Sequence, residues 1–519
     1  MSYKIICPYC FKEMEDDEVL FRSELVNHGE PDFLPDDYDD IKDFQARYRG
    51  ADKEEILAKY RDWEFFTEVK DPEYEAFWAN YGSTTEVSPA EKYLGVKEYY
   101  RRVIDPGNTY HQRYLKEQED GSYLIRDNQG MVAQIELKSG EKCYRRVCRH
   151  CHNPLPDNYG KYRVKFASVI GITGAGKTVY LSQLLKNMRQ YVAKVGLTAI
   201  VTNAGAQAFL ENNRIKAELP LPGSTPPERL QQPLFYELVR EDGAQGRITE
   251  TFVLYDVAGE VFKVADSVLV QRFAPFIAHS DGVIVLIDPM QFEVITNASK
   301  DQNQLDDPTA ALNTIQHIFT DNNANDKCTI PFAICISKAD QEEVQAVLSE
   351  DLRDLLLDDV RGIERGDGFN QTIFNARDYA PIGKGLTKFI KDNEIVLAQM
   401  MQTNYASYAY FALTALGCDV KEAVKDNGET YRYPVGPILP KRVEEPLLWL
   451  FYKLGYIGKN ANIPGEIICP NCGKQDNESI PEDERYIIER SGPFGLRKIE
   501  RYVNRFCRAC GFKWEHTEE

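Results

Sequence analysis

The sequence predicts an α/β fold, in which a mostly parallel sheet carries helices on both of its faces. Three apolar runs of strand length support this prediction, and each leads into a polar or glycine-containing turn: VKFASVI before GITGAGKT, TFVLY before DVAG, and PFAICI before SKAD. Residues 179–188 follow the first turn with the apolar spacing of a helix. Ligands of such sheets bind at the carboxyl ends of the strands, so we expect the three turns to form one site.

The composition is typical of a globular chain. Its 519 residues have room for about two to four domains, and 43% hydrophobic residues suffice for their cores. No apolar run approaches the ~18 residues of a membrane helix, and the N-terminal MSYKIICPYC lacks the regions of a signal peptide. We therefore expect a cytoplasmic protein without a transmembrane segment. The net charge of −19 argues against broad electrostatic binding to nucleic acid or anionic membranes.

The stretch GITGAGKT, residues 171–178, matches the phosphate-loop pattern G-x-x-x-x-G-K-[ST]. Its glycines allow a tight turn whose backbone N–H groups point at phosphate oxygens, and the next helix presents its positive end to the same anion. Lys177 supplies a charge for the β- and γ-phosphates, and Thr178 supplies a hydroxyl for Mg²⁺. The expected nucleotide contacts in this loop are Gly171, Thr173, Gly174, Ala175, Gly176, Lys177 and Thr178.

The second turn, DVAG, has the D-x-x-G pattern. Asp256 would hold Mg²⁺ through water, and the N–H of Gly259 would contact the γ-phosphate, so that the next segment moves when that phosphate leaves. The segment LPGSTPPERLQQPLFYEL precedes this strand, and its Thr225, or else Ser224, would complete the magnesium shell. Arg229 is either an internal arginine finger or, as we favour, a solvated charge. PLFYELVR and ITETFVLYD around EDGAQGR predict an antiparallel hairpin.

The third turn, SKAD, resembles the guanine-reading [NT]-K-x-D motif of GTPases. The aspartate of that motif accepts hydrogen bonds from the guanine N1–H and 2-amino groups, a donor pair that adenine lacks, and the lysine stem packs over the base. Asp340 is the candidate base reader and Lys338 the packing residue, whereas Ser337 departs from Asn or Thr. Further along, YAYFALTALG resembles the loop whose backbone touches guanine. The expected positions are Thr414, Ala415 and Leu416.

Eight of the twelve cysteines form four C-x-x-C pairs, a spacing that places two thiolates on one metal ion. In a cytoplasmic protein such pairs indicate metal ligands rather than disulfides. We expect CPYC and CRHC to share one structural zinc site, and CPNC and CRAC to form a second. A redox role for CPYC is the alternative, but the βαβ context is missing. The expected zinc ligands are Cys7, Cys10, Cys148, Cys151, Cys469, Cys472, Cys507 and Cys510.

These motifs divide the chain into four parts. Residues 1–14 and 143–160 make a split N-terminal zinc ribbon, 15–142 an acidic, aromatic-rich α+β insertion, 161–460 the nucleotide domain, and 461–519 a C-terminal zinc ribbon. The insertion has a helical pattern in FQARYRGADKEEILAKYRDWEFF and a hairpin pattern in YLIRDNQGMVAQIEL. Its aromatic residues can bury a core that docks on the nucleotide domain or on a partner. EEPLLWLFYKLGYIGK is expected to close the nucleotide domain as a helix.

In this order the motifs resemble the TRAFAC class of GTPases, with a Ras-like P-loop NTPase fold. GKTVYL, LPGSTPP and a preceding zinc ribbon make the arrangement similar to bacterial double-GTPase-type domains. The resemblance implies a place in bacterial conflict or membrane-associated signalling systems. It also implies catalytic roles for Lys177, Thr178, Thr225, Asp256, Gly259 and Glu260.

Glu260 stands where many members of the class have a glutamine that orients the attacking water. An ionised carboxylate cannot donate the same hydrogen bond. Hydrolysis is therefore expected to be slow, or to depend on a partner that supplies the missing group.

We therefore expect a Mg²⁺-dependent protein that binds GTP and GDP, hydrolyses GTP, uses zinc in two structural sites, and acts on a protein effector or responds to an activator. One alternative is an ATPase that binds nucleic acid through its C-terminal ribbon, although we favour a solvated face that balances an acidic protein. The other is a scaffold that binds GTP without turnover. The basic and aromatic residues of that ribbon are Arg497, Lys498, Arg501, Arg505, Arg508, Lys513, Phe506, Phe512 and Trp514.

Overall fold

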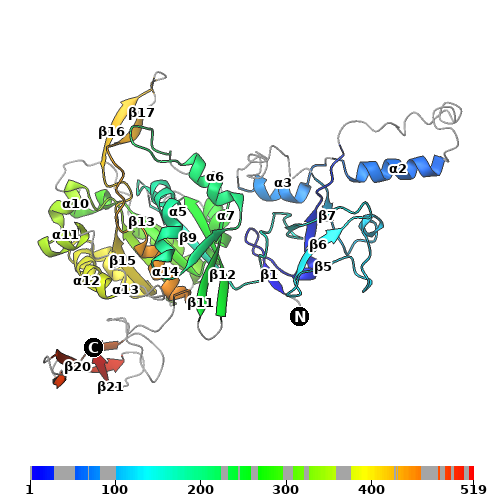
Figure 1. Ribbon diagram of the computed structural model, residues 1–519. Coiled ribbons are helices and arrows are strands. Elements are labelled where there is room, and N and C mark those ends of the chain that lie inside the picture. The colour runs from blue at the N-terminus through cyan, green and yellow to red at the C-terminus, as the bar shows by residue number, and fades with distance from the viewer. Residues whose placement is uncertain are drawn as a thin grey trace.

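A computed structural model shows a seven-stranded sheet at the centre of the molecule, with the strand order β10-β11-β12-β9-β13-β14-β15 (Figure 1). The structure describes residues 3–27, 53–67, 69–81, 101–172, 174–223, 232–242, 246–258, 267–295, 308–320, 326–357, 376–425, 428, 430–457, 477–479, 485–491, 496–507 and 513–518.

Five strands of this sheet are parallel. β9 (Val164–Gly171) lies between β12 (Gly246–Ala258) and β13 (Gly282–Ile287), and the sheet continues through β14 (Cys328–Ile336) to β15 (Tyr405–Ala412). The carboxyl ends of these strands therefore share one edge. β11 (Leu234–Asp242) pairs antiparallel with β12, which confirms the predicted hairpin, and β10 (Thr198–Val201) adds an antiparallel edge strand that the sequence analysis did not predict.

Helices cover both faces of the sheet, as predicted. α5 (Lys177–Ala193), α6 (Ala204–Asn212) and α14 (Glu445–Leu454), the predicted closing helix, bury one face. α7 (Ser267–Ala278), α9 (Pro308–Phe319), α12 (Ala376–Asn393) and α13 (Ile395–Asn404) lie on the other. Two short helices, α10 (Glu342–Val347) and α11 (Glu350–Leu357), follow β14.

The N-terminal part contains small sheets and the helices of the insertion. β1 (Lys4–Ile6) pairs with β2 (Glu13–Glu15), and β3 (Leu20–Arg22) pairs with β4 (Val103–Ile104) and β8 (Arg145–Val147). The insertion adds α2 (Lys53–Phe65) and α3 (Pro72–Ala79), together with β5 (Ile125–Arg126), β6 (Val132–Glu136) and β7 (Lys142–Cys143). The helix α2 and the antiparallel pair β5–β6 lie inside the segments predicted to be helix and hairpin.

The N-terminal part packs on the nucleotide domain, and the two share one continuous buried cluster. The Phe11 ring stacks on His279 with 4.4 Å between ring centroids, and it meets Phe276 of α7 edge-on at 5.3 Å. Tyr81 of the insertion also meets Phe276 edge-on at 5.3 Å. Of the two docking surfaces left open by the sequence, the insertion therefore uses the nucleotide domain.

The remaining strands form two separate sheets, one between β15 and α14 and one after α14. β18 (Asn477–Ser479), β19 (Arg485–Ser491), β20 (Leu496–Cys507) and β21 (Lys513–Glu518) form an antiparallel sheet. β16 (Asp419–Val424) and β17 (Thr430–Val435) form an unpredicted hairpin that projects from the body at the top of Figure 1. The N–H of Leu221 donates to Arg432 in β17 at 2.7 Å, so the segment before residue 224 runs beside this hairpin.

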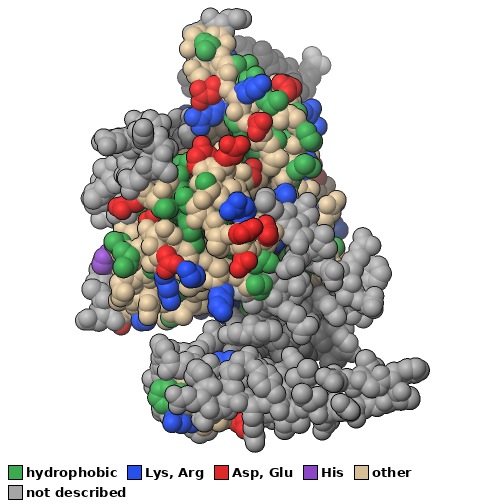
Figure 2. All heavy atoms as spheres, turned by 90° about the vertical axis from the view of Figure 1, so that its left-hand side faces the viewer, with side chains coloured by type: hydrophobic (Ala, Val, Ile, Leu, Met, Phe, Trp, Pro, Cys, Tyr) green, Lys and Arg blue, Asp and Glu red, His purple; other side chains and the backbone are tan. Residues whose placement is uncertain are grey.

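None of the described helices has both the length and the apolar character needed to cross a bilayer. On the face shown in Figure 2, Lys and Arg side chains are mixed with Asp and Glu side chains across the described residues. The cytoplasmic location stays a prediction.

Candidate functional site

The phosphate loop joins β9 to α5 at the carboxyl edge of the sheet. Gly174 and Gly176 have φ values of +72° and +71°, a left-handed conformation that glycine adopts at low cost. A Cβ at Gly171 would lie 2.6 Å from the Cβ of Lys177, and a Cβ at Gly174 would lie 2.9 Å from Asp288 Oδ2, so neither position has room for a side chain. A Cβ at Gly176 would meet nothing within 4 Å, which leaves open space at the N-terminus of α5. A glycine-containing loop at the N-terminus of a helix is a site where backbone N–H groups and the helix dipole can bind an anion.

Lys177 and Asp256 form a buried ion pair between the first turn of α5 and the end of β12. Their side chains are 8% and 1% exposed, and Thr178 beside Lys177 is also buried. The structure thus brings together the residues predicted for the phosphates and for Mg²⁺ from two distant segments. Buried charges need partners of opposite charge, so we expect phosphate to replace Asp256 as the partner of Lys177 when nucleotide binds.

The end of β13 connects the phosphate loop to the base motif. The carbonyl oxygen of Leu286 accepts a hydrogen bond from the N–H of Ile172 at 2.9 Å. The carbonyl oxygen of Ile287 accepts from both the N–H and the hydroxyl of Ser337, each at 3.0 Å. Ser337, the residue that departs from Asn or Thr, therefore uses its hydroxyl to tie β14 to β13 and remains 3% exposed.

Asp288, the next residue, was missed by the sequence analysis. It is 4% exposed, and its Oδ2 accepts from Lys338 Nζ at 2.7 Å while its Oδ1 accepts from the N–H of Met290 at 3.1 Å. One signal was available, because DGVIVLIDP is an apolar run that leads into an Asp, as TFVLY does before Asp256. Parallel strand ends share an edge, so this position could have been included.

The base motif and the predicted guanine loop meet at the next two strand ends. The N–H of Ala339 donates to Leu413 at 3.1 Å, and the hydroxyl of Thr414 donates to Asp340 Oδ1 at 3.1 Å. Thr414 is 4% exposed and is held by two backbone hydrogen bonds with Lys441. The orientation of the Asp340 carboxylate is therefore fixed by a buried hydroxyl.

The residues after Thr414 continue this loop. Leu416 accepts a backbone hydrogen bond from Leu439 at 2.7 Å, and Ala415 lies between these two tied positions. The structure thus places Ala415 and Leu416 in the same short loop as Thr414, next to Asp340.

Several predicted residues lie outside the described part of the chain, and their roles stay predictions. They are Thr173 of the phosphate loop, Ser224, Thr225 and Arg229 of the switch segment, and Gly259 and Glu260 after β12.

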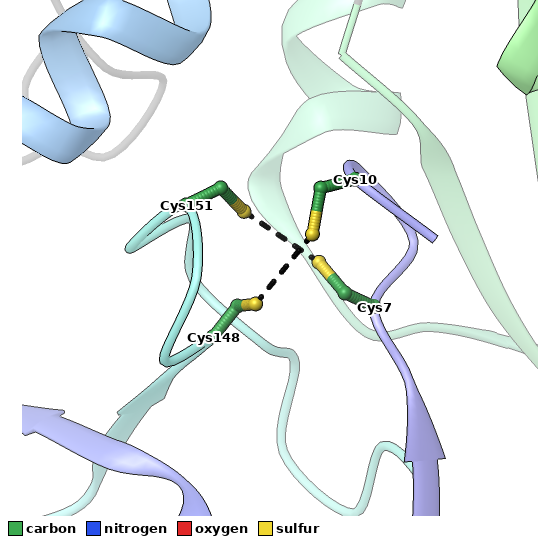
Figure 3. A group of neighbouring side chains, drawn as sticks. All are labelled: Cys7, Cys10, Cys148 and Cys151. Atoms are coloured by element: carbon green, nitrogen blue, oxygen red, sulfur yellow. Dashed lines mark hydrogen bonds between the residues drawn. The ribbon is translucent and has the colours of Figure 1, made fainter. Parts of the chain in front are cut away.

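The first two cysteine pairs meet in space, although the whole insertion separates them in sequence (Figure 3). The Sγ atoms of Cys7 and Cys151 lie 3.7 Å apart, as do those of Cys10 and Cys148, and all four lie within 4.8 Å of one another. Tetrahedral zinc with Zn–S bonds of about 2.3 Å separates its sulfur atoms by about 3.8 Å. The four thiols therefore have the spacing of a closed four-sulfur zinc site.

The two cysteine turns have the same local geometry. The N–H of Phe11 donates to Cys7 at 3.0 Å, and the N–H of His152 donates to Cys148 at 2.9 Å. Phe11 and His152 both have a left-handed φ, of +56° and +52°. The first sulfur of each pair also accepts a backbone N–H, from Tyr9 and His150. Two such turns facing each other are typical of paired zinc knuckles.

His152 contacts an acidic group beside the cysteines rather than the sulfur cluster. Its Nδ1 lies 2.8 Å from Asp71 Oδ1, and Asp71 Oδ2 accepts from Arg22 at 2.7 Å. Burial raises the pKa of Asp71, but the hydrogen bond with His152 and the charge of Arg22 outweigh burial and lower it. Asp71 already has a basic partner, so we interpret this group as a structural ion pair that joins α3 to the second cysteine turn.

Of the four C-terminal cysteines, Cys507 belongs to the described residues and is buried at the end of β20. Cys469, Cys472 and Cys510 lie outside them, so the second zinc site stays a prediction. In the sheet register, Lys498 lies opposite Glu489 and Arg501 lies opposite Glu518. In the same register, Arg497 lies opposite Arg490.

Comparison with known proteins gives a family match for the centre of the chain. Residues 165–393 match the family model described as Double-GTPase 2. The matched segment begins in β9 and ends in α12, so it includes the phosphate loop, the D-x-x-G strand and SKAD.

One similar protein is the putative ESX-1 scaffolding and assembly protein SaeC of Mycolicibacterium smegmatis. The two are 28% identical over 166 residues, which cover 30% of this chain and 41% of the relative. The match thus spans less than half the length of that relative.

Solved structures that are similar include Sup35 complexed with GMPPNP, at 11% identity over 69% of this chain and 61% of that chain, with a TM-score of 0.23. Another is the Ski7 GTPase-like domain of S. cerevisiae bound to GDP and inorganic phosphate, at 11% identity over 66% of this chain and 58% of that chain, with a TM-score of 0.25. The strand order of the seven-stranded sheet and the motifs at its edge define the fold.

Proposed function

We propose that this chain, whose residues 165–393 form a double-GTPase-type domain, is a GTP-binding switch protein that hydrolyses GTP with Mg²⁺. The observation that carries this proposal is the convergence of three motifs at one edge of the sheet. The ion pair of Lys177 and Asp256 lies at one end of the site, beside β9 and β12. Asp340 lies at the other end, after β14, which is separated from β9 by β13.

Guanine selection would rest on Asp340. The carboxylate is oriented by Thr414 and can accept from the guanine N1–H and 2-amino groups. A site built for such a donor pair rejects adenine because its acceptor would then be left without a partner. Lys338 would pack its stem over the base, and the backbone of residues 414–416 would border it.

Phosphate binding and hydrolysis would use the loop amides, Lys177 and Thr178. Thr178 and Asp256 would hold Mg²⁺, with Thr225 completing its shell, and the ion would neutralise charge on the phosphate oxygens. Gly259 would sense the γ-phosphate. Glu260 in place of a glutamine leads us to propose that turnover is slow until a partner supplies a further group.

Zinc in the N-terminal cysteine cluster would have a structural role. Four sulfur ligands close the coordination sphere and leave no position for substrate. The ion would hold the CPYC turn in shape, and this turn carries Pro8 and Tyr9 onto the nucleotide domain. The predicted second zinc site would close the C-terminal sheet in the same way.

We further propose a protein partner rather than a nucleic acid. The similar SaeC is named as a putative scaffolding and assembly protein, which suggests an assembly setting for this chain as well as the conflict or signalling setting implied by the resemblance. The net charge of −19 also favours a protein partner over a nucleic acid.

The experiment follows phosphate release from GTP and Mg²⁺ by the purified, zinc-loaded chain, beside Lys177→Ala. We expect slow release that Lys177→Ala abolishes and that cell lysate accelerates in the wild-type chain above the lysate background. The second candidate function, a GTP-binding scaffold, is favoured by the name of SaeC. Tight GTP binding without release, with or without lysate, would select the scaffold. Absence of GTP binding would contradict both.

A further inference from the structure

We infer that Asp288 is a positioning residue for base selection, which acts by fixing Lys338. This inference rests on the proposed guanine site. Asp288 belongs to none of the motifs from which that site was predicted, yet its carboxylate lies between the phosphate loop and the base motif.

The contacts of the Asp288 carboxylate define its position. Oδ2 lies 2.7 Å from Lys338 Nζ and 2.9 Å from the place where a Cβ of Gly174 would be. Oδ1 accepts from the N–H of Met290 at 3.1 Å. The hydrogen bond from Met290 therefore holds Oδ1 within the turn after β13, while Oδ2 lies between Gly174 of the phosphate loop and the ammonium group of Lys338.

Lys338 needs such a constraint to act as a packing surface. The backbone of Lys338 has a left-handed φ of +49°, unlike the extended backbone of β14, and the Lys338 side chain is 35% exposed. A lysine stem has four rotatable bonds and loses much conformational freedom when ordered. Because Asp288 holds the ammonium group, the stem is ordered before a base arrives, and less entropy is lost on binding.

Charge gives the pair a second role. A carboxylate beside a phosphate loop would repel the phosphates of a nucleotide, and a buried charge without a counter-charge is costly. Lys338 neutralises Asp288, so the carboxylate can remain next to Gly174 without opposing phosphate binding.

The competing explanation is that Asp288 only caps the turn over η6 (Pro289–Gln291). Substitutions separate the two roles. Serine at this position can still accept the N–H two residues ahead, as Ser does in similar turns, but it is too short to reach Lys338. Asparagine removes the charge and has a single acceptor oxygen, so in this geometry it can accept from Lys338 or from the N–H of Met290, but not from both.

The experiment measures competitive binding of GTP and ATP to the full chain, beside the variants Asp288→Ser, Asp288→Asn, Lys338→Met and the double variant Asp288→Ser/Lys338→Met. The readout is the ratio of the ATP and GTP dissociation constants. Without Asp288 the Lys338 stem would no longer hold the base against Asp340, so Asp288→Ser should lower this ratio roughly tenfold, the size expected for a lost hydrogen bond to a charged group. Asp288→Asn should lower the ratio less than Asp288→Ser does, by about threefold, since one uncharged acceptor oxygen remains.

The double variant tests whether Asp288 acts through Lys338. If it does, Lys338→Met should lower the ratio, and adding Asp288→Ser should lower it no further, because coupled residues are not additive. The inference would be overturned if the fold-change in the double variant equals the product of the two single fold-changes, or if Asp288→Ser leaves the ratio unchanged. This cycle remains decisive if Asp288→Ser is also less stable, because lost stability would lower GTP and ATP affinity together.

The variant Asp340→Asn separates this inference from the proposed function. If the wild-type chain prefers GTP and Asp340→Asn abolishes the preference while Asp288→Ser keeps it, the inference alone fails. If the wild-type chain shows no preference for GTP, the proposed guanine site fails and the inference fails with it.

Discussion

The hydroxyl of Tyr255 donates a hydrogen bond to the carbonyl oxygen of Pro8 at 2.8 Å, inside the molecule. Tyr255 immediately precedes Asp256 on β12, and Pro8 lies between the two cysteines of the first pair. The bond therefore joins the first cysteine turn to the strand that carries the expected magnesium residue. It makes the cysteine cluster part of the support of the nucleotide site.

Removing this hydroxyl should destabilise the protein. Tyr255→Phe leaves the buried Pro8 carbonyl without its donor, which should cost about 1–3 kcal/mol of unfolding free energy. Tyr3→Phe is the matched control, because the Tyr3 hydroxyl donates to Gln129 at 2.9 Å in an exposed position where water can replace it. Urea unfolding compares the two. Equal losses in both variants would contradict the buried role of the Tyr255 bond.

The cysteine cluster should hold one zinc ion. Cys7→Ser should lower the zinc content of the purified chain by about one ion, since a closed site needs all four sulfur ligands. It should also lower the midpoint of thermal unfolding, because the cluster shares a core with the sheet. Cys143→Ala is the control, since Cys143 is buried but lies outside the cluster. Elemental analysis showing no zinc in the wild-type chain, or the same loss in both variants, would refute the assignment.

Gly174→Ala should impair nucleotide binding beyond the cost of backbone strain. Gly174 and Gly130 both have a left-handed φ, but a Cβ at Gly174 would meet Asp288 Oδ2 at 2.9 Å, whereas a Cβ at Gly130 would meet nothing within 4 Å. Both variants should lose about 1 kcal/mol of stability. Only Gly174→Ala should weaken GTP binding, by at least about tenfold, because the loop must shift. Calorimetric titration with GTP that finds Gly174→Ala as tight as Gly130→Ala would contradict the loop assignment.

The buried start of α14 should make stability depend on pH. Burial raises the pKa of Glu445 to about 7, against the opposing charge of Arg442. The folded state therefore holds this proton more tightly than the unfolded state, so its contribution is complete below about pH 4.5 and is lost as pH rises towards 7. The loss should be at most about 3 kcal/mol.

Glu445→Gln isolates this contribution, because glutamine does not titrate. As the pH rises from 5 to 8, the wild type should lose up to about 3 kcal/mol of unfolding free energy relative to Glu445→Gln. Denaturant unfolding at several pH values measures it. A difference that stays constant with pH, or that shifts in the opposite direction, would show that Arg442 keeps Glu445 charged throughout.

Local motifs account for the parts of the fold that the sequence predicted. The phosphate loop, the hairpin before DVAG and the helix α14 each depend on residues close together in the chain, and each appears where expected. The pairing of CPYC with CRHC was also predictable, because neither pair has another partner nearby in sequence.

Other features depend on contacts between distant segments, which the sequence does not show directly. The strand β10 pairs with β11, and although Thr198, Ile200 and Val201 favour strands, four residues are too few to form a recognisable strand pattern. Phe11 looks like a residue of the first ribbon in sequence, yet its ring packs on α7 of the nucleotide domain. Asp288 follows an ordinary buried strand, and its partner Lys338 comes fifty residues later.

The most direct measurement is the equilibrium binding of fluorescent GTP, GDP and ATP to the zinc-loaded chain, beside Asp340→Asn and Lys177→Ala. The account predicts a wide preference for guanine nucleotides, its loss in Asp340→Asn, and weak binding of every nucleotide by Lys177→Ala. Equal binding of ATP and GTP by the wild-type chain would contradict it and would assign residues 171–178 to an ATPase.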